Sequence, residues 1–217
     1  MNRHKSSPGG RRGAHRVVCT LAGLLLISPS NALRANGSQQ PDISVREQQG
    51  IYRVEATFHV PEPLPVALAV LTDYEQIPRF MPAVKTSVVR DRLADGSVLV
   101  EQEAVARLMM FSKRVHLMLE VSTEGHTVRF RDACGRSFHT YQGIWRMERT
   151  DGSTVITYEL TARPSFSVPE FLLTRLLERD AKQMIDRLRG EIAARGRNQA
   201  SQFSASEPQR VADHRHR

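Results

Sequence analysis

Hydrophobic and polar residues alternate along most of the stretch between residues 84 and 163, with the period of two that is typical of β-strands. Pairs such as Asp95-Gly96 and Asp151-Gly152 separate the alternating runs, and such pairs favour tight hairpin turns. Six successive strands joined by tight turns predict an antiparallel meander. The predicted strands cover residues 84–93, 97–107, 113–122, 126–133, 138–149 and 153–163.

A further alternating run at residues 52–60 precedes the meander and can join its edge. Closely spaced prolines end this run and open a short helix over about residues 64–71. Asp73 is followed three residues later by Gln76, a capping-box arrangement that predicts a second short helix ending near Phe80.

The last regular element is a long amphipathic helix from Pro169 to about Ala194, in which apolar residues recur at spacings of three and four. Because this apolar stripe has to be buried, and the sheet is the only large partner, we expect the helix to lie across the concave face of the sheet. The expected fold is of the α+β class: an antiparallel seven-stranded curved sheet, two short helices after its first strand, and a long C-terminal helix. The stripe comprises Val168, Leu172, Leu176, Leu177, Ala181, Met184, Ile185, Leu188 and Ile192.

The N-terminus has the three-part pattern of a secretory signal peptide over residues 1–32. Residues 1–16 are basic, Val17–Ile27 is an apolar run, and small residues precede a cleavage site after Ala32. The run is shorter than the roughly 20 apolar residues that span a membrane. The pattern predicts export, to a bacterial periplasm. An uncleaved N-terminal anchor and export by the twin-arginine route, suggested by Arg11-Arg12, stay open as alternatives.

The formal charge of +8 comes from the two ends of the chain. Residues 1–32 carry five Lys or Arg and no acid, and residues 194–217 carry five Arg and two acids, so the part between them is neutral. This distribution gives no support to nucleic-acid binding. The polar stretch 33–49 predicts a flexible lead-in, and 195–217 predicts a disordered basic tail. One domain at 50–194 is left between them.

Three motifs carry a resemblance to a known family: Val70–Pro82 after the first strand, Tyr141–Trp145 in a late strand, and Thr157–Pro164 in the last. With the order of elements, they resemble the START-like (SRPBCC) superfamily, in particular its polyketide cyclase/dehydrase and coenzyme Q-binding branch. The resemblance covers about residues 50–194 and implies a helix-grip fold. It also implies a cavity for a hydrophobic ligand between the sheet and the long helix.

Alternation assigns residues to the inner face of the sheet, and therefore to the lining of such a cavity. His139, Tyr141 and Trp145 share that face in their strand, and small residues such as Ala104 and Gly143 leave room for a ligand. A few polar groups on an apolar lining are typical of a small-molecule pocket. The alternative, that these side chains only pack the core, stays open. The candidate ligand-binding residues are Gln102, Phe130, Asp132, Tyr141, Trp145 and Tyr158.

The sequence carries no pattern that requires catalysis, a metal or a cofactor. Its strand histidines are dispersed, Glu101 and Glu103 are assigned to the solvent face, and Cys134 is the one cysteine left after signal cleavage. The apolar corner Leu108–Phe111 is interpreted either as a cavity entrance that touches a membrane or as an ordinary core corner. We therefore expect no cofactor.

The leading hypothesis is an exported, monomeric domain that binds or carries a lipid, quinone or polyketide-like molecule. Its partners would be this small molecule and, transiently, a membrane, but no nucleic acid. One alternative is a small cyclase or dehydratase that uses the same cavity, so the sequence does not decide whether the protein is an enzyme. Another is a protein-interaction module with a closed cavity, which would hold less than about 300 Å³.

Overall fold

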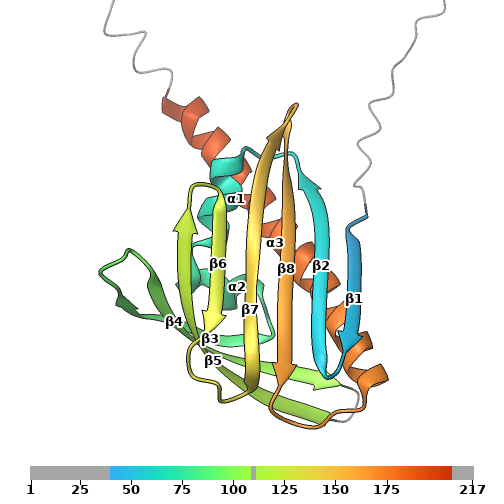
Figure 1. Cartoon of the computed structure of the whole chain (residues 1–217). Helices are drawn as coiled ribbons and strands as arrows, with labels where there is room; N and C mark the ends of the chain where they lie inside the picture. The colour runs from blue at the N-terminus through green and yellow to red at the C-terminus, as the bar shows by residue number, and fades with distance from the viewer. Residues whose placement is uncertain (1–39, 109–110, 207–217) are drawn as a thin grey trace, which may run out of the picture. The chain divides into compact units, whose positions relative to one another are not determined.

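The computed structural model of the chain describes residues 40–108 and 111–206, which belong to one unit, Gly37–Arg217. Eight strands and three α-helices follow one another, with a short 3-10 turn at Tyr74–Gln76 (Figure 1). No helix in these two stretches is long and apolar enough to cross a membrane. The elements are β1 (Asp42–Gln48), β2 (Ile51–Val60), α1 (Leu64–Leu71), α2 (Ile77–Phe80), β3 (Val84–Arg92), β4 (Val98–Leu108), β5 (Phe111–Glu124), β6 (Thr127–Asp132), β7 (Phe138–Thr150), β8 (Ser153–Pro164) and α3 (Glu170–Ser206).

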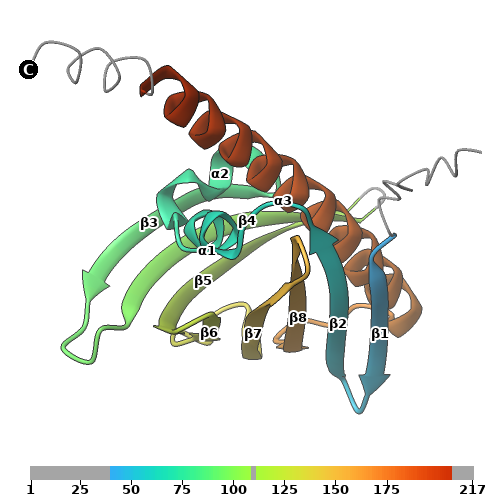
Figure 2. The same ribbon diagram turned by 90° about the horizontal axis from the view of Figure 1, so that it is seen from above.

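The strands form one antiparallel sheet in the order β1-β2-β8-β7-β6-β5-β4-β3. Strands β3 to β8 are neighbours in sequence order, which confirms the predicted meander. Strand β2 pairs along its length with β8. The sheet curves into an arc, and α3 runs across its concave side. The short helices α1 and α2 lie on the same side of the sheet (Figure 2).

One half of the concave face is packed solid against the helices. Phe58 of β2 and Ile156 of β8 are completely buried, as are Ile185 and Ile192 in the second half of α3. The apolar face of α1 joins this core through Val70. Burial of this apolar area stabilises the α3–sheet contact, and the stripe predicted for the long helix lies where it was expected.

The sheet has eight strands instead of seven, because β1 forms within the predicted flexible lead-in. Strand β1 pairs with β2 through a two-residue turn, in which Gln49 and Gly50 both have positive φ, 55° and 76°. Such turns usually carry Asn-Gly or Asp-Gly. Because this turn has Gln49-Gly50 instead, the sequence pattern did not predict a hairpin. Ile43 and Val45 pack against the core and hold the strand in place. The two short α-helices consequently follow the second strand.

Two further differences concern the ends of helices. Asp73 makes no capping hydrogen bond, and the segment after it is a 3-10 turn followed by the single turn of α2. Its carboxylate instead pairs with Arg195, Oδ2 to Nη1 2.8 Å, in α3. Helix α3 continues to Ser206, into the stretch predicted to be a disordered tail, and Arg195 also bonds Glu191 one turn earlier. Nothing in this stretch breaks the helix, since the next proline is Pro208.

Candidate functional site

A cavity of about 660 Å³ lies between the first half of α3 and the half of the sheet that the core leaves open. This volume falls in the range of about 300–1,000 Å³ that is typical of small-molecule sites. Its walls are mostly apolar and come from β2, the start of β3, β4, β5, β7, β8, α3 and the segment between β8 and α3. The lining comprises Tyr52, Val54, Ala83, Val84, Gln102, Ala104, Val105, Ala106, Ser112, Lys113, Val115, Leu117, Phe138, Tyr141, Tyr158, Leu160, Ala162, Pro164, Phe166, Ser167, Val168, Pro169, Leu172, Leu173, Leu176, Leu177, Asp180, Ala181 and Met184.

Small side chains on the inner face of the sheet keep this space open. Ala104, Ala106 and Ala162 line it, as alternation predicts. Gly143, expected to leave room in the same way, behaves differently. A Cβ at Gly143 would lie 2.5 Å from Cζ of Phe130 and closer still to a main-chain oxygen of the next strand. The ring of Phe130 therefore occupies the space above Gly143, and that space is not part of the cavity.

Six aromatic rings follow one another along the inner face, and four of them line the cavity. Ring centroids are 6.3 Å apart for Phe166 and Phe138, and 4.8 Å apart for Phe138 and Tyr141. Phe130 continues the series, 5.9 Å from Tyr141 and 6.5 Å from Tyr158. The series ends at Trp145, 4.2 Å from Tyr158. These spacings are favourable for aromatic pairs, and the four lining rings give the cavity one aromatic wall.

Two tyrosine hydroxyls belong to this wall. Among the residues that the structure describes, none forms a hydrogen bond with Tyr141 or Tyr158, yet neither oxygen is sealed away from the cavity. Burial, together with the negative charge of Asp132, raises the pKa of Tyr141 to about 12. Burial also raises the pKa of Tyr158 well above its ordinary value, and Tyr141 adds to this effect. Both phenols are therefore neutral hydrogen-bond donors at physiological pH.

The rim of the cavity carries two charged side chains. Lys113 of β5 places its ammonium 5.0 Å from the centre of the Phe166 ring. Asp180 of α3 is half-buried, and burial raises the pKa of its carboxyl, although the neighbouring Arg179 acts in the opposite direction. Arg179 also donates a 2.5 Å hydrogen bond to the carbonyl oxygen of Arg107, which ties α3 to the end of β4.

The six predicted ligand-binding residues divide into two groups. Gln102, Tyr141 and Tyr158 line the cavity, and Gln102 also donates a 3.1 Å hydrogen bond to Ser87. The other three do not line it. Phe130 and Trp145 belong to the core behind the wall.

Asp132 lies at the end of β6, where both of its carboxylate oxygens accept main-chain hydrogen bonds. Oδ1 accepts from the amides of Met118 (2.9 Å) and Cys134 (3.2 Å), and Oδ2 accepts from Gly135 (3.0 Å). The carboxylate thereby closes the turn between β6 and β7 and does not line the cavity. Cys134 lies half-buried beside it, just after the end of β6.

Sequence reasoning missed Phe138 and Phe166, and assigned His139 to the wrong face. A bulge between residues 138 and 140 shifts the register of β7 against β8, so Phe138 shares the inner face with Tyr141 while His139 is exposed. Alternation fails at a bulge, because one strand gains an extra residue there. Phe166 lies outside any strand, where no periodicity could identify it. The corner Leu108–Phe111 lies at the edge of the described residues, which exclude 109 and 110, and its predicted role as an entrance stays a prediction.

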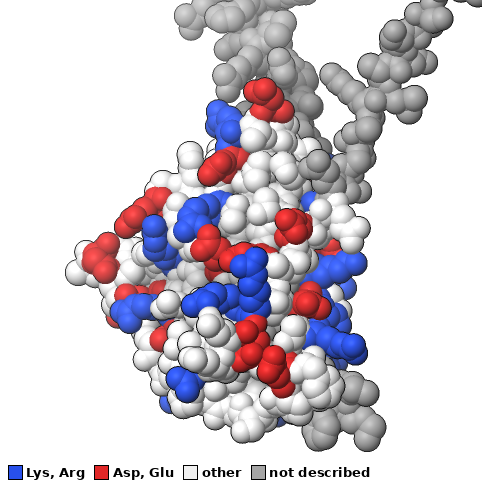
Figure 3. Space-filling view, turned by 45° about the vertical axis from the view of Figure 1, so that its right-hand side comes forward, with Lys and Arg blue, Asp and Glu red and all other residues white. Residues whose placement is uncertain are grey.

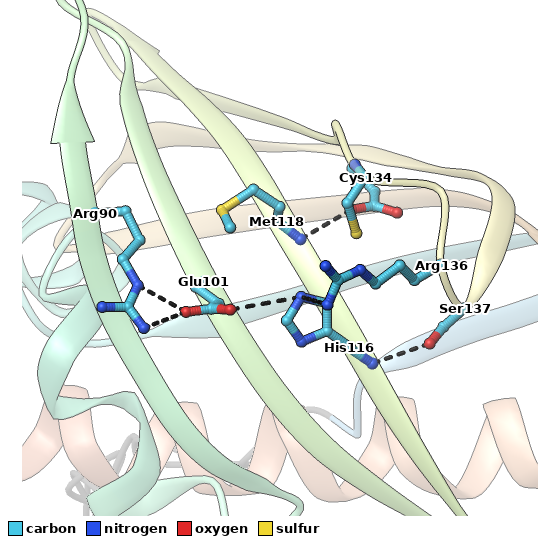
Figure 4. A network of polar contacts seen from close by, with 8 residues as sticks. Arg90, Glu101, His116, Met118, Cys134, Arg136 and Ser137 are labelled. Carbon is cyan, nitrogen blue, oxygen red and sulfur yellow. Dashed lines mark hydrogen bonds and ion pairs between the residues drawn. The ribbon is translucent and has the colours of Figure 1, made fainter.

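On the opposite face of the sheet, a polar network joins β3, β4, β5 and the loop before β7 (Figure 4). Glu101 accepts hydrogen bonds from Arg90, and its other oxygen lies 3.5 Å from Nε2 of His116. Arg136 approaches the same imidazole nitrogen at 3.3 Å. The guanidinium of Arg90 holds the pKa of Glu101 below its ordinary value. The predicted solvent-face position of Glu101 is thus that of a surface ion pair.

Charges elsewhere on the surface are mixed in sign. On the face seen in Figure 3, Lys and Arg are interspersed with Asp and Glu, and no large area carries a single sign. The central strands β5 to β8 contribute further pairs, including Arg131–Glu120 and Arg146–Glu159. Over residues 40–108 and 111–206, no group of three or more His, Cys, Asp or Glu is arranged to hold a metal ion. The cavity is therefore the best candidate for a functional site.

Comparison with known proteins agrees with this architecture. Residues 52–193 match the family model described as polyketide cyclase/dehydrase and lipid transport. No curated protein sequence matches the chain.

Three solved structures illustrate the similarity of fold. A STAR-related lipid transfer protein from Xanthomonas axonopodis has 16% identity and a TM-score of 0.59, over 71% of this chain and 94% of its own. Human STARD10 has 12% identity and a TM-score of 0.57, over 80% and 81%. The Zhui aromatase/cyclase from Streptomyces sp. R1128 has 16% identity and a TM-score of 0.52, over 67% and 95%.

Proposed function

Because the chain belongs to the polyketide cyclase/dehydrase and lipid-transport family, we propose that it is an exported domain that binds a hydrophobic or amphipathic small molecule, such as a lipid, quinone or polyketide-like compound. The observation that carries this proposal is the cavity of about 660 Å³ beside an otherwise fully packed core. A ligand would gain roughly 25 cal/mol for each Å² of apolar surface that it buries there. The few polar groups of the lining would set its orientation.

The cavity argues against one of the two alternatives predicted from the sequence and supports the other. A protein-interaction module with a closed cavity is not supported, since the volume is about twice the limit of 300 Å³ expected for it. A cyclase or dehydratase is a second candidate, favoured by the two neutral phenols of Tyr141 and Tyr158, which can act as hydrogen-bond donors to a reacting carbonyl. Incubation with a linear poly-β-ketone thioester tests it, because cyclisation with dehydration lowers the substrate mass by one water.

We also propose a location and mode of action for the domain. Residues 1–32 direct export to the periplasm, where the domain works as a monomer. Near the cavity mouth, the first turn of α3 presents Phe171, which is 64% exposed, with the exposed Arg175 one turn further along. An apolar ring next to a cation suits transient contact with a membrane surface.

Native mass spectrometry tests export and binding in one experiment. The full chain is produced in a bacterium, and its periplasmic fraction is purified without detergent. We expect an intact mass that corresponds to cleavage after Ala32, together with a discrete added mass that is lost on denaturation. Ala104→Leu, which narrows the cavity from one wall, should be cleaved equally well but lose the added mass.

The two parts of the proposal fail separately. An uncleaved chain that stays in the cytoplasm contradicts export. A folded, cleaved protein with no added mass, and with no affinity for any apolar probe, contradicts ligand binding.

A further inference from the structure

Building on the proposed binding function, we propose that Tyr141 and Tyr158 form a donor pair that selects the ligand. The pair would hydrogen-bond a neutral oxygen acceptor, of carbonyl type, on a flat ring that enters the cavity with this oxygen first. The polar residues Lys113 and Asp180 would then remain at the outer end of the ligand.

Neither hydroxyl has a hydrogen-bond partner among the residues that the structure describes. Buried polar groups in folded proteins are nearly always hydrogen-bonded, and an exception needs an explanation. The side chain of Tyr158 is only 4% exposed, and that of Tyr141 is partly buried, yet within the described stretches neither hydroxyl has a partner. Tyr74 provides the contrast, because it does not line the cavity and the side chain of Thr123 acts on its hydroxyl, lowering the pKa that burial raises. A ligand oxygen would satisfy the pair in the cavity.

Tyr158 lies deep in the cavity. Tyr158 lies in β8 between Ile156, which is completely buried in the packed core, and Leu160, which lines the cavity. The Tyr158 ring therefore forms part of the cavity floor, where the open space meets the packed half of the fold. A hydrogen bond there is made away from water, which strengthens it and makes the loss of it costly.

The electrostatic surroundings of the two phenols favour a neutral acceptor. The negative charge of Asp132 acts on Tyr141, where it helps to keep the phenol protonated. The same field disfavours a ligand carboxylate at this position. Both phenols stay neutral, so they offer protons to an oxygen and no charge to an anion. A ketone, quinone or ester oxygen meets these conditions better than a fatty-acid headgroup does.

The aromatic side of the cavity favours a flat ligand. Four rings line it, those of Phe138, Tyr141, Tyr158 and Phe166, with centroids 4.8 Å apart for Phe138 and Tyr141 and 6.3 Å apart for Phe138 and Phe166. Stacked and tilted aromatic contacts favour a flat ring against this side, beyond the gain from area alone. The opposite side is formed by aliphatic residues of α3, such as Leu173 and Leu176.

A matched set of probes tests the pair. Fluorene and 9-fluorenone are flat and nearly equal in size, but only fluorenone carries a carbonyl oxygen. Their dissociation constants are measured by calorimetry and by the fluorescence of Trp145, the only tryptophan of the chain, which contacts Tyr158. Fluorene-9-carboxylate serves as the charged analogue. The variants are Tyr141→Phe, Tyr158→Phe and the double variant, with Tyr74→Phe as the control.

We expect the wild-type protein to bind fluorenone about tenfold more tightly than fluorene, as two neutral hydrogen bonds allow. The double variant should lose this preference, each single variant should lose part of it, and Tyr74→Phe should retain it. Affinity for fluorene should not fall in any variant, which shows that the cavity is intact. The carboxylate should bind more weakly than fluorenone at pH 7.

Several outcomes overturn the inference. Equal binding of fluorene and fluorenone, or a preference that survives in the double variant, removes the role of the pair while the proposed binding function stands. Tighter binding of the carboxylate refutes the neutral acceptor. Failure of the folded wild-type protein to bind any of the three probes overturns this inference. The proposed binding function is then tested only by the added mass in native mass spectrometry.

Discussion

Substitution of Ala104 by leucine should stabilise the protein, although the same change at a neighbouring inward-facing position should destabilise it. Ala104 lines the cavity from β4, where a larger side chain finds empty space. Ala56 faces the same side of the sheet from β2, but is 2% exposed and does not line the cavity. Both positions are in strands, so strand propensity cannot explain a difference between the two variants.

The magnitude follows from the three carbons that leucine adds to alanine. Each contributes about 0.8 kcal/mol on burial, and restriction of the longer side chain costs about 0.5–1 kcal/mol. Ala104→Leu should therefore raise the free energy of unfolding by about 1–2 kcal/mol. At Ala56 the added carbons meet packed neighbours, and overpacking costs about 1–3 kcal/mol. The variants should differ in sign.

Urea unfolding followed by the fluorescence of Trp145 measures both values, and an unchanged m-value confirms that the unfolding reaction is the same. Binding of an apolar probe is measured in parallel, and should be weakened at least tenfold in Ala104→Leu but retained in Ala56→Leu. If Ala104→Leu destabilises the protein as much as Ala56→Leu does, the space is closed in solution. The reasoning from the cavity to a ligand would then be refuted.

Three further predictions can be checked on the same material. Gly143→Ala should lower the free energy of unfolding by about 1–3 kcal/mol in urea, since a Cβ there meets an aromatic ring and a main-chain oxygen; Gly190→Ala, in open space on α3, should raise it by about 0.5–1 kcal/mol. Asp73→Asn should remove the half-exposed ion pair with Arg195 and cost at most about 1 kcal/mol, an effect that 1 M salt should abolish. The raised pKa of Asp180 means that the folded state binds this proton more tightly than the unfolded state does. This carboxyl therefore lowers the free energy of unfolding as the pH rises above 3.8, the ordinary pKa of the group. Asp180→Asn should accordingly be more stable than the wild type at pH 7 and flatten this fall, and an unchanged pH profile of unfolding would contradict the burial argument.

Much of the fold follows from local patterns in the sequence. Alternation placed the strands of the meander to within about three residues, and the short helix at Leu64–Leu71 has the predicted bounds. The inner faces of β4 and β8 were also assigned correctly, since Ala104 and Tyr158 line the cavity. These assignments succeed because the side-chain period of a strand is a property of consecutive residues. The one wrong face, at His139, lies at a bulge, which depends on pairing with another strand.

The parts that could not be predicted depend on partners distant in sequence. Asp73 has the spacing of a helix cap, but its partner is Arg195, more than a hundred residues away. Strand β1 is held by pairing with β2 and by contacts of its short apolar side chains. The longer α3 includes residues whose composition alone predicts disorder. In each case a tertiary contact outweighed a weak local preference.

For the site, the sequence by itself determined which side chains face inward, and so supplied Gln102, Tyr141 and Tyr158 as candidates. Only the tertiary structure decided which of the inward-facing residues surround empty space. Gly143 and Ala104 are both small, but Phe130 covers the first and nothing fills the space beside the second. The physical reason is that the cavity is the space left between α3 and a curved sheet. The size of that space depends on how bulky side chains from several strands pack together, which no local pattern of residues specifies.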